Sequence, residues 1–214
     1  MSNEVISTRP LCLLAQMADQ TMRTFGDFQC AEIDSVLEMN GIDPRRVYDR
    51  SNLKTLPFVK LNLSIEKANV LRKRCVLLRR IYEIWSEGSD LESAIKALSK
   101  TTKEHASYAF TVYGIHVKLN MKTQQIIREH VLDRIDPKGS VNLKNPDLKM
   151  CAVLVYGEIC EEPKESYDPI KYVANERAKN NWRKLTHVYI GRDLGEGSRG
   201  LITKFSLKKR PFLG

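Results

Sequence analysis

The sequence predicts an α+β chain that contains two small domains. Short runs of alternating or continuous apolar residues, typical of strands, are separated by segments in which apolar residues recur at helical spacing. The chain has 214 residues, of which 42% are apolar and 29% charged, so it is long enough for one large or two small globular domains. Helices and strands that alternate in this way favour packing of helices on a sheet.

The first ninety residues predict one small domain. Strands and helices are expected in alternation, at residues 11–15, 30–39, 58–63, 65–71 and 81–85. Asn40-Gly41 is a stop signal for the first helix, and Ser64 can cap the second. A ferredoxin-like sandwich is the simplest packing of these elements. Glu87-Gly88 marks the expected boundary, so the first domain is residues 1–87.

The remaining chain predicts a second α+β domain over residues 88–208. Its elements are expected to be helices at 91–98 and 122–135 and strands at 107–118, 148–156, 187–191 and 201–208. Ser89 is expected to cap the first helix in a capping box with Glu92. Asp136-Pro137 ends the second helix. Residues 158–185 are highly charged and are expected to form a long insert between two strands, with room for a helix of its own.

Charge and cysteine usage narrow the class of protein. The formal net charge of +9 attracts polyanions, such as RNA, DNA or an anionic membrane surface. The five cysteines are odd in number and have no Cys-x-x-Cys spacing, so neither a disulfide framework nor a zinc site is supported. They are expected to be reduced, as in a cytosolic or nuclear protein. The apolar run at 11–17 is too short to span a membrane.

Residues 195–200 read GEGSRG and formally match the G-x-G-x-x-G fingerprint. A dinucleotide site requires this loop to open a helix inside a βαβ unit. The residues that follow alternate like a strand, so a nucleotide cofactor is not expected here. Two interpretations stay open. The loop is either a flexible turn, or a loop whose N–H groups, beside Arg192 and Arg199, contact phosphate oxygens.

Two groups of cations are candidate binding sites. The C-terminal group comprises Arg192, Arg199, Lys204, Lys208, Lys209 and Arg210. This group can contact RNA, or it can be a solvated edge strand on which lysines discourage pairing. The other group, residues 72–74 with 79–80, is expected to be the solvated end of a helix rather than a docking site. The histidines show no metal-ligand spacing, His116 and His187 are expected to pack in strands, and neither a metal site nor a catalytic residue is predicted.

Two segments resemble a known family. Residues 141–147, VNLKNPD, lead into an apolar strand, and a later strand ends at the glycine-rich loop. This arrangement resembles the THUMP domain of RNA-modification enzymes. Residues 187–214 resemble more closely the segment before the catalytic domain in eukaryotic tRNA guanosine-10 2-methylguanosine methyltransferase catalytic subunits. The resemblance spans most of the chain, strongly over 139–214 and weakly before about residue 75.

The resemblance implies a tRNA-binding role. In that family the ferredoxin-like and THUMP domains grip the acceptor end of tRNA and position it for methylation of guanosine 10. The C-terminal cations would then contact phosphate and sugar, and Asn145 would shape the neighbouring turn. The alternatives are a protein-interaction module without RNA binding, and a self-sufficient enzyme that uses the glycine loop with a nucleotide.

The resemblance also implies that the catalytic domain lies outside this sequence. Residues 209–214 are expected to be the junction to it, because the family's S-adenosylmethionine loop and catalytic motif are not found in residues 1–214. The chain is therefore expected to hold no cofactor and to be inactive alone, with S-adenosylmethionine bound by the missing domain. An activator subunit is expected only through that domain. The expected partner is tRNA, with no membrane, and the expected location is the cytoplasm.

Overall fold

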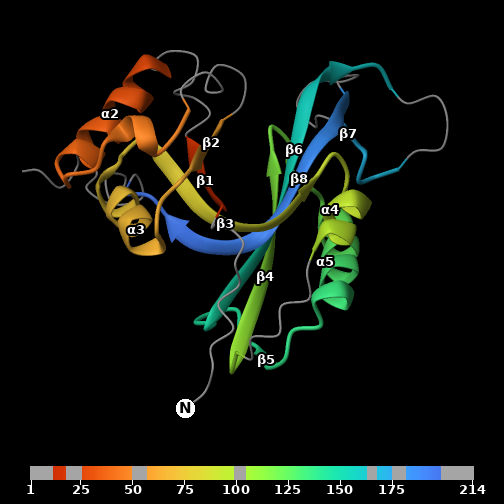
Figure 1. The fold of residues 1–214 in the computed structure, drawn as a ribbon. Coiled ribbons are helices and arrows are strands. Elements are labelled where there is room, and N and C mark those ends of the chain that lie inside the picture. The colour runs from red at the N-terminus through yellow and green to blue at the C-terminus, as the bar shows by residue number, and fades with distance from the viewer. Residues whose placement is uncertain are drawn as a thin grey trace, which may run out of the picture. The chain divides into compact units, whose positions relative to one another are not determined.

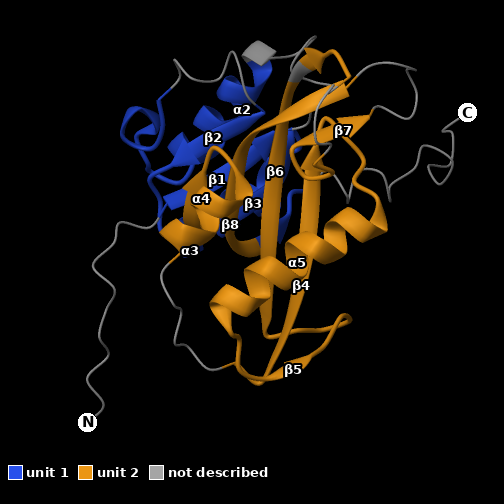
Figure 2. Ribbon diagram, turned by 90° about the vertical axis from the view of Figure 1, so that its right-hand side faces the viewer, with its two compact units in different colours: residues 1–83, 194–214 blue, residues 84–193 orange. Residues whose placement is uncertain are grey.

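The computed structural model describes residues 12–17, 26–49, 57–98, 105–162, 168–174 and 182–198. The chain divides into two compact units (Figure 2). Unit 1 comprises residues 1–83 and 194–214, and unit 2 comprises residues 84–193. The division falls within two strands, β3 (Leu78–Gly88) and β8 (Trp182–Glu196), so each of these strands supplies residues to both units.

Unit 1 alternates strands with helices, as the first ninety residues predict (Figure 1). Its elements are β1 (Cys12–Met17), α2 (Gly26–Glu38), the short 3₁₀ helix η1 (Pro44–Arg46), β2 (Phe58–Leu61), α3 (Ile65–Arg74) and the first residues of β3. Strand β1 pairs antiparallel with β2 and lies between β2 and β3. Apolar residues of both helices pack on the strands, among them Ile33 and Leu37 of α2 and Leu71 of α3.

The helix stop and cap signals that the sequence predicts are present in unit 1. Gly41 follows α2 with φ of +69°, a left-handed conformation that glycine adopts without the steric cost of a Cβ. Ser64 is the N-cap of α3, and its hydroxyl accepts a hydrogen bond from the backbone N–H of Lys67. Local sequence therefore accounts for the end of one helix and the start of the other.

Unit 2 is a mixed sheet with two helices. Its elements are α4 (Leu91–Ala97), β4 (Ser107–Ile115), α5 (Met121–Ile135), β5 (Ser140–Val141), β6 (Leu148–Cys160) and β7 (Tyr172–Ala174), with the remaining residues of β3 and β8. The strand order is β3-β8-β6-β4-β5, and β7 pairs with β8. Strand β4 runs parallel to β5 and β6, whereas β8 runs antiparallel to β6 and β7. The predicted α+β class with a mixed sheet is confirmed.

Strand β6 is the centre of the unit 2 core. Its even-numbered residues from Leu148 to Tyr156 cluster with Ile127 and Val131 of α5. Cys151, Val153 and Val155, on its other face, are also buried. Burial on both faces is what the uninterrupted apolar run of this strand predicts.

The predicted cap of α4 is wrong by one residue. Asp90, not Ser89, is the N-cap, since its Oδ1 accepts from the backbone N–H of Ser93 at 2.8 Å. The backbone N–H of Asp90 donates to the hydroxyl of Ser93 at 3.2 Å, so Ser93 rather than Glu92 completes the capping box. Glu92 instead pairs with Lys96 at 2.8 Å. Because serine and aspartate are both good caps, their adjacency left the start of the helix undecided.

Two strand limits also differ from prediction. Strand β4 ends at Ile115, and His116 lies outside it with φ of +69°, its Nδ1 2.8 Å from the carbonyl oxygen of Tyr156. Strand β8 is much longer than residues 187–191. Trp182 and Cys160 pair across β8 and β6, so both ends of the predicted 158–185 insert belong to strands.

Some predictions are not tested by the described residues. The strand expected at 201–208 lies outside them. Within the insert, the described residues 168–174 form a turn and β7. The domain limits 1–87, 88–208 and 209–214 stay predictions, because compact units defined by contacts need not coincide with the domains of a family.

The capping box predicts how α4 responds to substitution. Asp90→Ala should lower the free energy of unfolding by about 1 kcal/mol, because it removes the acceptor for the Ser93 N–H. Asp90→Asn keeps an acceptor and Ser89→Ala keeps the cap, so both should stay closer to the wild type. Chemical denaturation of the three variants measures the order of their free energies of unfolding. A wild-type midpoint for Asp90→Ala would contradict the assignment.

The stabilisation by the Asp90 cap should depend on pH in a defined direction. The hydrogen bond from the Ser93 backbone lowers the pKa of Asp90 below its ordinary value. A carboxyl whose pKa is lowered on folding stabilises the protein above its unfolded pKa of about 3.9, and this contribution is lost as the pH falls through the folded pKa. The advantage of wild type over Asp90→Asn should therefore shrink below about pH 4.

Candidate nucleic-acid interface

Two of the seven predicted RNA contacts lie in the described part of the chain. Arg192 is half-buried in β8, where it pairs in register with Met150 of β6. Asn145 is exposed in the turn between β5 and β6. The other five lie outside the described residues: Arg199, Lys204, Lys208, Lys209 and Arg210. Both described members belong to unit 2, on different elements.

The turn that contains Asn145 is held by the side chain of Asn142. The Oδ1 of Asn142 accepts from the backbone N–H groups of Lys144 and Asn145, both at 3.1 Å, and its Nδ2 donates to the carbonyl oxygen of Asn145 at 3.0 Å. Ser107 closes the turn, since its hydroxyl donates to Asp147 Oδ2 and accepts from Asp147 N. Asn145 contributes backbone groups, so its exposed side chain is not needed to hold the turn.

This rigid turn presents two kinds of side chain to solvent. Lys144 is exposed, and the apolar residues Val141 and Leu143 are 64% and 79% exposed. A lysine can contact a phosphate, and aliphatic groups can contact sugars or base edges. The sequence signal for this surface was the pair of asparagines, because asparagine side chains often bind backbone groups within turns.

The glycine motif does not present its central N–H groups to a ligand. Gly195 and Glu196 are the last residues of β8. The N–H of Gly197 donates to the carbonyl oxygen of Arg79 at 2.9 Å, and that of Ser198 donates to the carbonyl oxygen of Cys75 at 3.3 Å. The hydroxyl of Ser198 also donates to Cys75 O, at 2.7 Å. These groups are engaged within unit 1, so residues 197–198 are not a phosphate cradle.

Close backbone approach explains the glycines. A Cβ added to Gly197 would overlap the carbonyl oxygen of Leu78. Gly195 has φ of +111°, which side chains rarely tolerate, and it lies against the guanidinium of Arg72. The motif therefore allows the end of β8 to pack against the start of β3, a structural rather than a ligand-binding use of glycine.

A group of five cations surrounds this contact, and we call it the basic corner: Arg72, Lys73, Arg74, Arg79 and Arg80. The first three form the last turn of α3, as expected for the solvated end of a helix, whereas Arg79 and Arg80 lie in β3. Glu196 binds two members. Its carboxylate pairs with Arg80, and its backbone carbonyl oxygen accepts from the Arg72 guanidinium at 3.2 Å.

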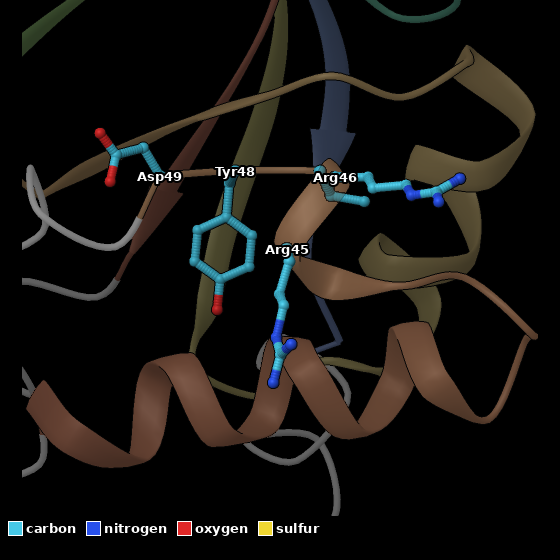
Figure 3. A pocket seen from close by; sticks show the side chains of 5 residues that line it. Arg45, Arg46, Tyr48 and Asp49 are labelled. Carbon is cyan, nitrogen blue, oxygen red and sulfur yellow. The ribbon is translucent and has the colours of Figure 1, made fainter.

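A shallow pocket of about 550 Å³ lies beside η1 in unit 1 (Figure 3). Arg45 and Tyr48 lie side by side there, and Arg46 and Asp49 point away from them. The Tyr48 hydroxyl donates to Asp34 Oδ1 at 2.7 Å, so this phenol is already engaged. Arg46 lies 3.7 Å from the Asp43 carboxylate. The pocket offers a cationic surface that the sequence did not single out.

Two observations in the described residues bear on metal binding and on the reactivity of Cys75. No group of three His, Cys, Asp or Glu side chains there could hold a metal ion. Burial, and then the negative charge of Glu32, raise the pKa of the Cys75 thiol to about 12. A thiol that stays protonated at neutral pH is a poor nucleophile. No helix in this part of the chain has both the length and the apolar character to cross a membrane.

The fold and these surfaces define an α+β protein with a mixed sheet and exposed cationic surfaces. The chain belongs to the Tmrp11 THUMP N-terminal domain family, whose model matches residues 19–199. This match confirms the family resemblance that the sequence suggests.

Curated relatives are tRNA methyltransferases. The chain is 28% identical over 200 residues to the tRNA (guanine(10)-N(2))-methyltransferase TRMT11 of Mus musculus, and 23% identical over 199 residues to the tRNA (guanine(10)-N(2))-methyltransferase of Saccharomyces cerevisiae. Each match covers 88% of this chain but only 38% and 41% of the relative. TrmN from Thermus thermophilus is similar in structure, with a TM-score of 0.48 and 14% identity over 87% of this chain and 46% of TrmN.

Two asparagines in the turn provide a matched pair of variants. Asn142→Ala should lower the free energy of unfolding by about 1–2 kcal/mol, because it removes three hydrogen bonds. Asn145→Ala should stay within about 0.5 kcal/mol of wild type, since its side chain is exposed. Chemical denaturation separates the two. Equal losses of stability in the two variants would contradict the conclusion that the Asn142 side chain holds the turn.

The close approach at Gly197 predicts that one added methyl group destabilises the protein more than the loss of the neighbouring Ser198 hydroxyl. Gly197→Ala should lower the free energy of unfolding by about 1–3 kcal/mol, because the new Cβ overlaps the Leu78 carbonyl. Ser198→Ala loses only the hydroxyl bond to Cys75 O and should cost about 1 kcal/mol or less. Thermal and chemical unfolding measure both. Wild-type stability of Gly197→Ala would show that β8 does not end in this contact.

Proposed function

We propose that this chain is the tRNA-binding module of a tRNA guanine N2-methyltransferase. The observation that carries the proposal is the family match over residues 19–199, since the curated relatives are tRNA (guanine(10)-N(2))-methyltransferases. The net charge of +9 supports it, because an excess of cations attracts the phosphate backbone. In this proposal the module holds the acceptor end of tRNA while guanosine 10 is methylated by a catalytic domain outside this chain, in the cytoplasm.

The proposed contacts are to phosphate and sugar. They come from the seven residues predicted by the sequence: Asn145, Arg192, Arg199, Lys204, Lys208, Lys209 and Arg210. Such contacts orient a nucleic acid without reading bases, and RNA helices are recognised mainly by shape and backbone. A module of this kind therefore suits an enzyme that accepts several tRNAs. Residues 1–87 and 88–208 are the proposed domains, with 209–214 as the junction.

The methyl donor belongs to the other domain in this proposal. S-adenosylmethionine supplies the methyl group in such chemistry, but the glycine motif of this chain does not fit it, because the N–H groups of Gly197 and Ser198 bind carbonyls of unit 1. The described residues are therefore assigned to holding and orienting RNA. An activator subunit would dock on the catalytic domain.

Replacement of C-terminal cations tests the proposal. The variant Arg199→Ala/Lys208→Ala/Arg210→Ala should bind tRNA more weakly. Its slope of log affinity against log salt should be shallower by about 2–3, because each phosphate neutralised contributes about 0.7–0.9. Fluorescence anisotropy with labelled tRNA over a salt series measures both quantities.

The control removes equal charge elsewhere. Lys96, Lys138 and Lys171 each pair with a neighbouring acid, so their triple alanine variant should keep the wild-type slope. Unchanged binding by the C-terminal variant would reject these contacts. A wild-type chain that does not bind tRNA at moderate salt would instead favour the alternative, a protein-interaction module.

A further inference from the structure

Three members of the basic corner are exposed. Only residues 75–77 separate the end of α3 from the start of β3, so Lys73 and Arg74 lie within six positions of Arg79 in the chain, across this short connection. Arg72 and Arg80 are half-buried behind them, and the Arg80 side chain is only 16% exposed. The corner therefore has an inner pair and an outer trio of cations.

The acids at the corner are already engaged. The Glu196 carboxylate pairs with Arg80. The Glu32 carboxylate accepts from the backbone N–H groups of Val76 and Leu77, at 2.7 and 2.9 Å. Among the described residues, no hydrogen bond or ion pair engages the side chains of Lys73, Arg74 or Arg79. Within the part of the chain that the structure describes, the outer trio is thus left to solvent or to a ligand.

The backbone under the trio is firmly held. Glu32 fixes the residues after α3 from one side, and the bonds of Gly197 and Ser198 to Arg79 O and Cys75 O fix the connection from another. Leu78 and Ile81, on either side of Arg79 and Arg80, are buried in the core. A rigid support reduces the entropy that the cations lose when they bind.

The helix dipole explains only part of the trio. Cations in the last turn of a helix interact favourably with its dipole, which accounts for Lys73 and Arg74. Arg79 is on a strand, where this effect does not act, and four other cations lie within seven positions of it in the chain. Such a cluster is favourable when a polyanion neutralises it.

We propose that Lys73, Arg74 and Arg79, which are not among the C-terminal cations, form a phosphate-binding surface for tRNA on unit 1; this proposal rests on the proposed function. The chemistry of the surface favours RNA over a protein or a membrane. Protein interfaces have apolar cores, but Val76 and Leu77 are half-buried, and none of the exposed large apolar residues of the described chain lies within 65–83. Charge without exposed apolar surface fits a phosphate backbone.

The test uses the full 214-residue chain with Lys73→Ala/Arg74→Ala/Arg79→Ala. Its salt slope for labelled tRNA should be shallower by about 2–3. Between about 50 and 200 mM salt, wild-type affinity should then fall about 16- to 64-fold more than that of the variant. The melting temperature should stay close to that of the wild type, because the substitutions remove only the modest interaction of Lys73 and Arg74 with the helix dipole. The control is again the triple alanine variant of Lys96, Lys138 and Lys171.

A conservative variant keeps the test decisive. Arg74→Lys/Arg79→Lys preserves the charges and should keep the wild-type slope. If the wild type binds tRNA and the C-terminal variant weakens binding, but the corner variant keeps the wild-type slope, this inference is overturned and the proposed function stands. If the wild type does not bind tRNA, the proposed function fails first. Binding to phosphatidylserine-containing vesicles that only the corner variant loses, with tRNA binding unchanged, would assign the corner to a membrane and overturn the inference.

Discussion

The contact between the end of β8 and the start of β3 determines what the functional surface of unit 1 can be. Gly197 approaches the Leu78–Arg79 backbone so closely that no side chain fits, and Ser198 binds Cys75 twice. Residues more than a hundred positions apart in the chain thereby become neighbours. Apart from the Ser198 hydroxyl, the contact depends on backbone groups, so glycine at position 197 is its main requirement.

This contact determines which groups of the glycine motif and of the basic corner are engaged within the protein. The N–H groups that a phosphate-binding loop would use are taken by carbonyls of Arg79 and Cys75. Glu196 is brought to Arg80, and its carboxylate neutralises this one of the two inner cations. The outer cations keep their charge. In the function proposed above, anion binding therefore falls to side chains on α3 and β3 rather than to the loop amides.

Periodicity predicted much of the fold because most elements bury a regular pattern. Strands β1 and β2, helices α3 and α5 and the central strand β6 were all apparent from apolar spacing and end signals. The features that were predicted wrongly depend on tertiary contacts. His116 adopts positive φ where its ring meets Tyr156 O of β6, a contact across 40 positions of the chain that no local pattern encodes. The full length of β8 likewise follows from pairing with strands distant in sequence.

The candidate site was less predictable, because single residues act through contacts that the sequence does not show. The VNLKNPD segment marked the correct turn, but the expectation that Asn145 shapes it is wrong, because the side chain of Asn142 makes the bonds that hold it. Either asparagine could bind backbone groups, so the sequence does not distinguish them. Likewise, the sequence of the basic corner predicts only the solvated end of a helix. The pairing of Glu196 with Arg80 is seen only in the structure. Ion pairing across long sequence separations decides which charges are neutralised and which face solvent. A count of lysines and arginines along the chain therefore predicts that a polyanion is attracted, but the fold selects the side chains able to bind it.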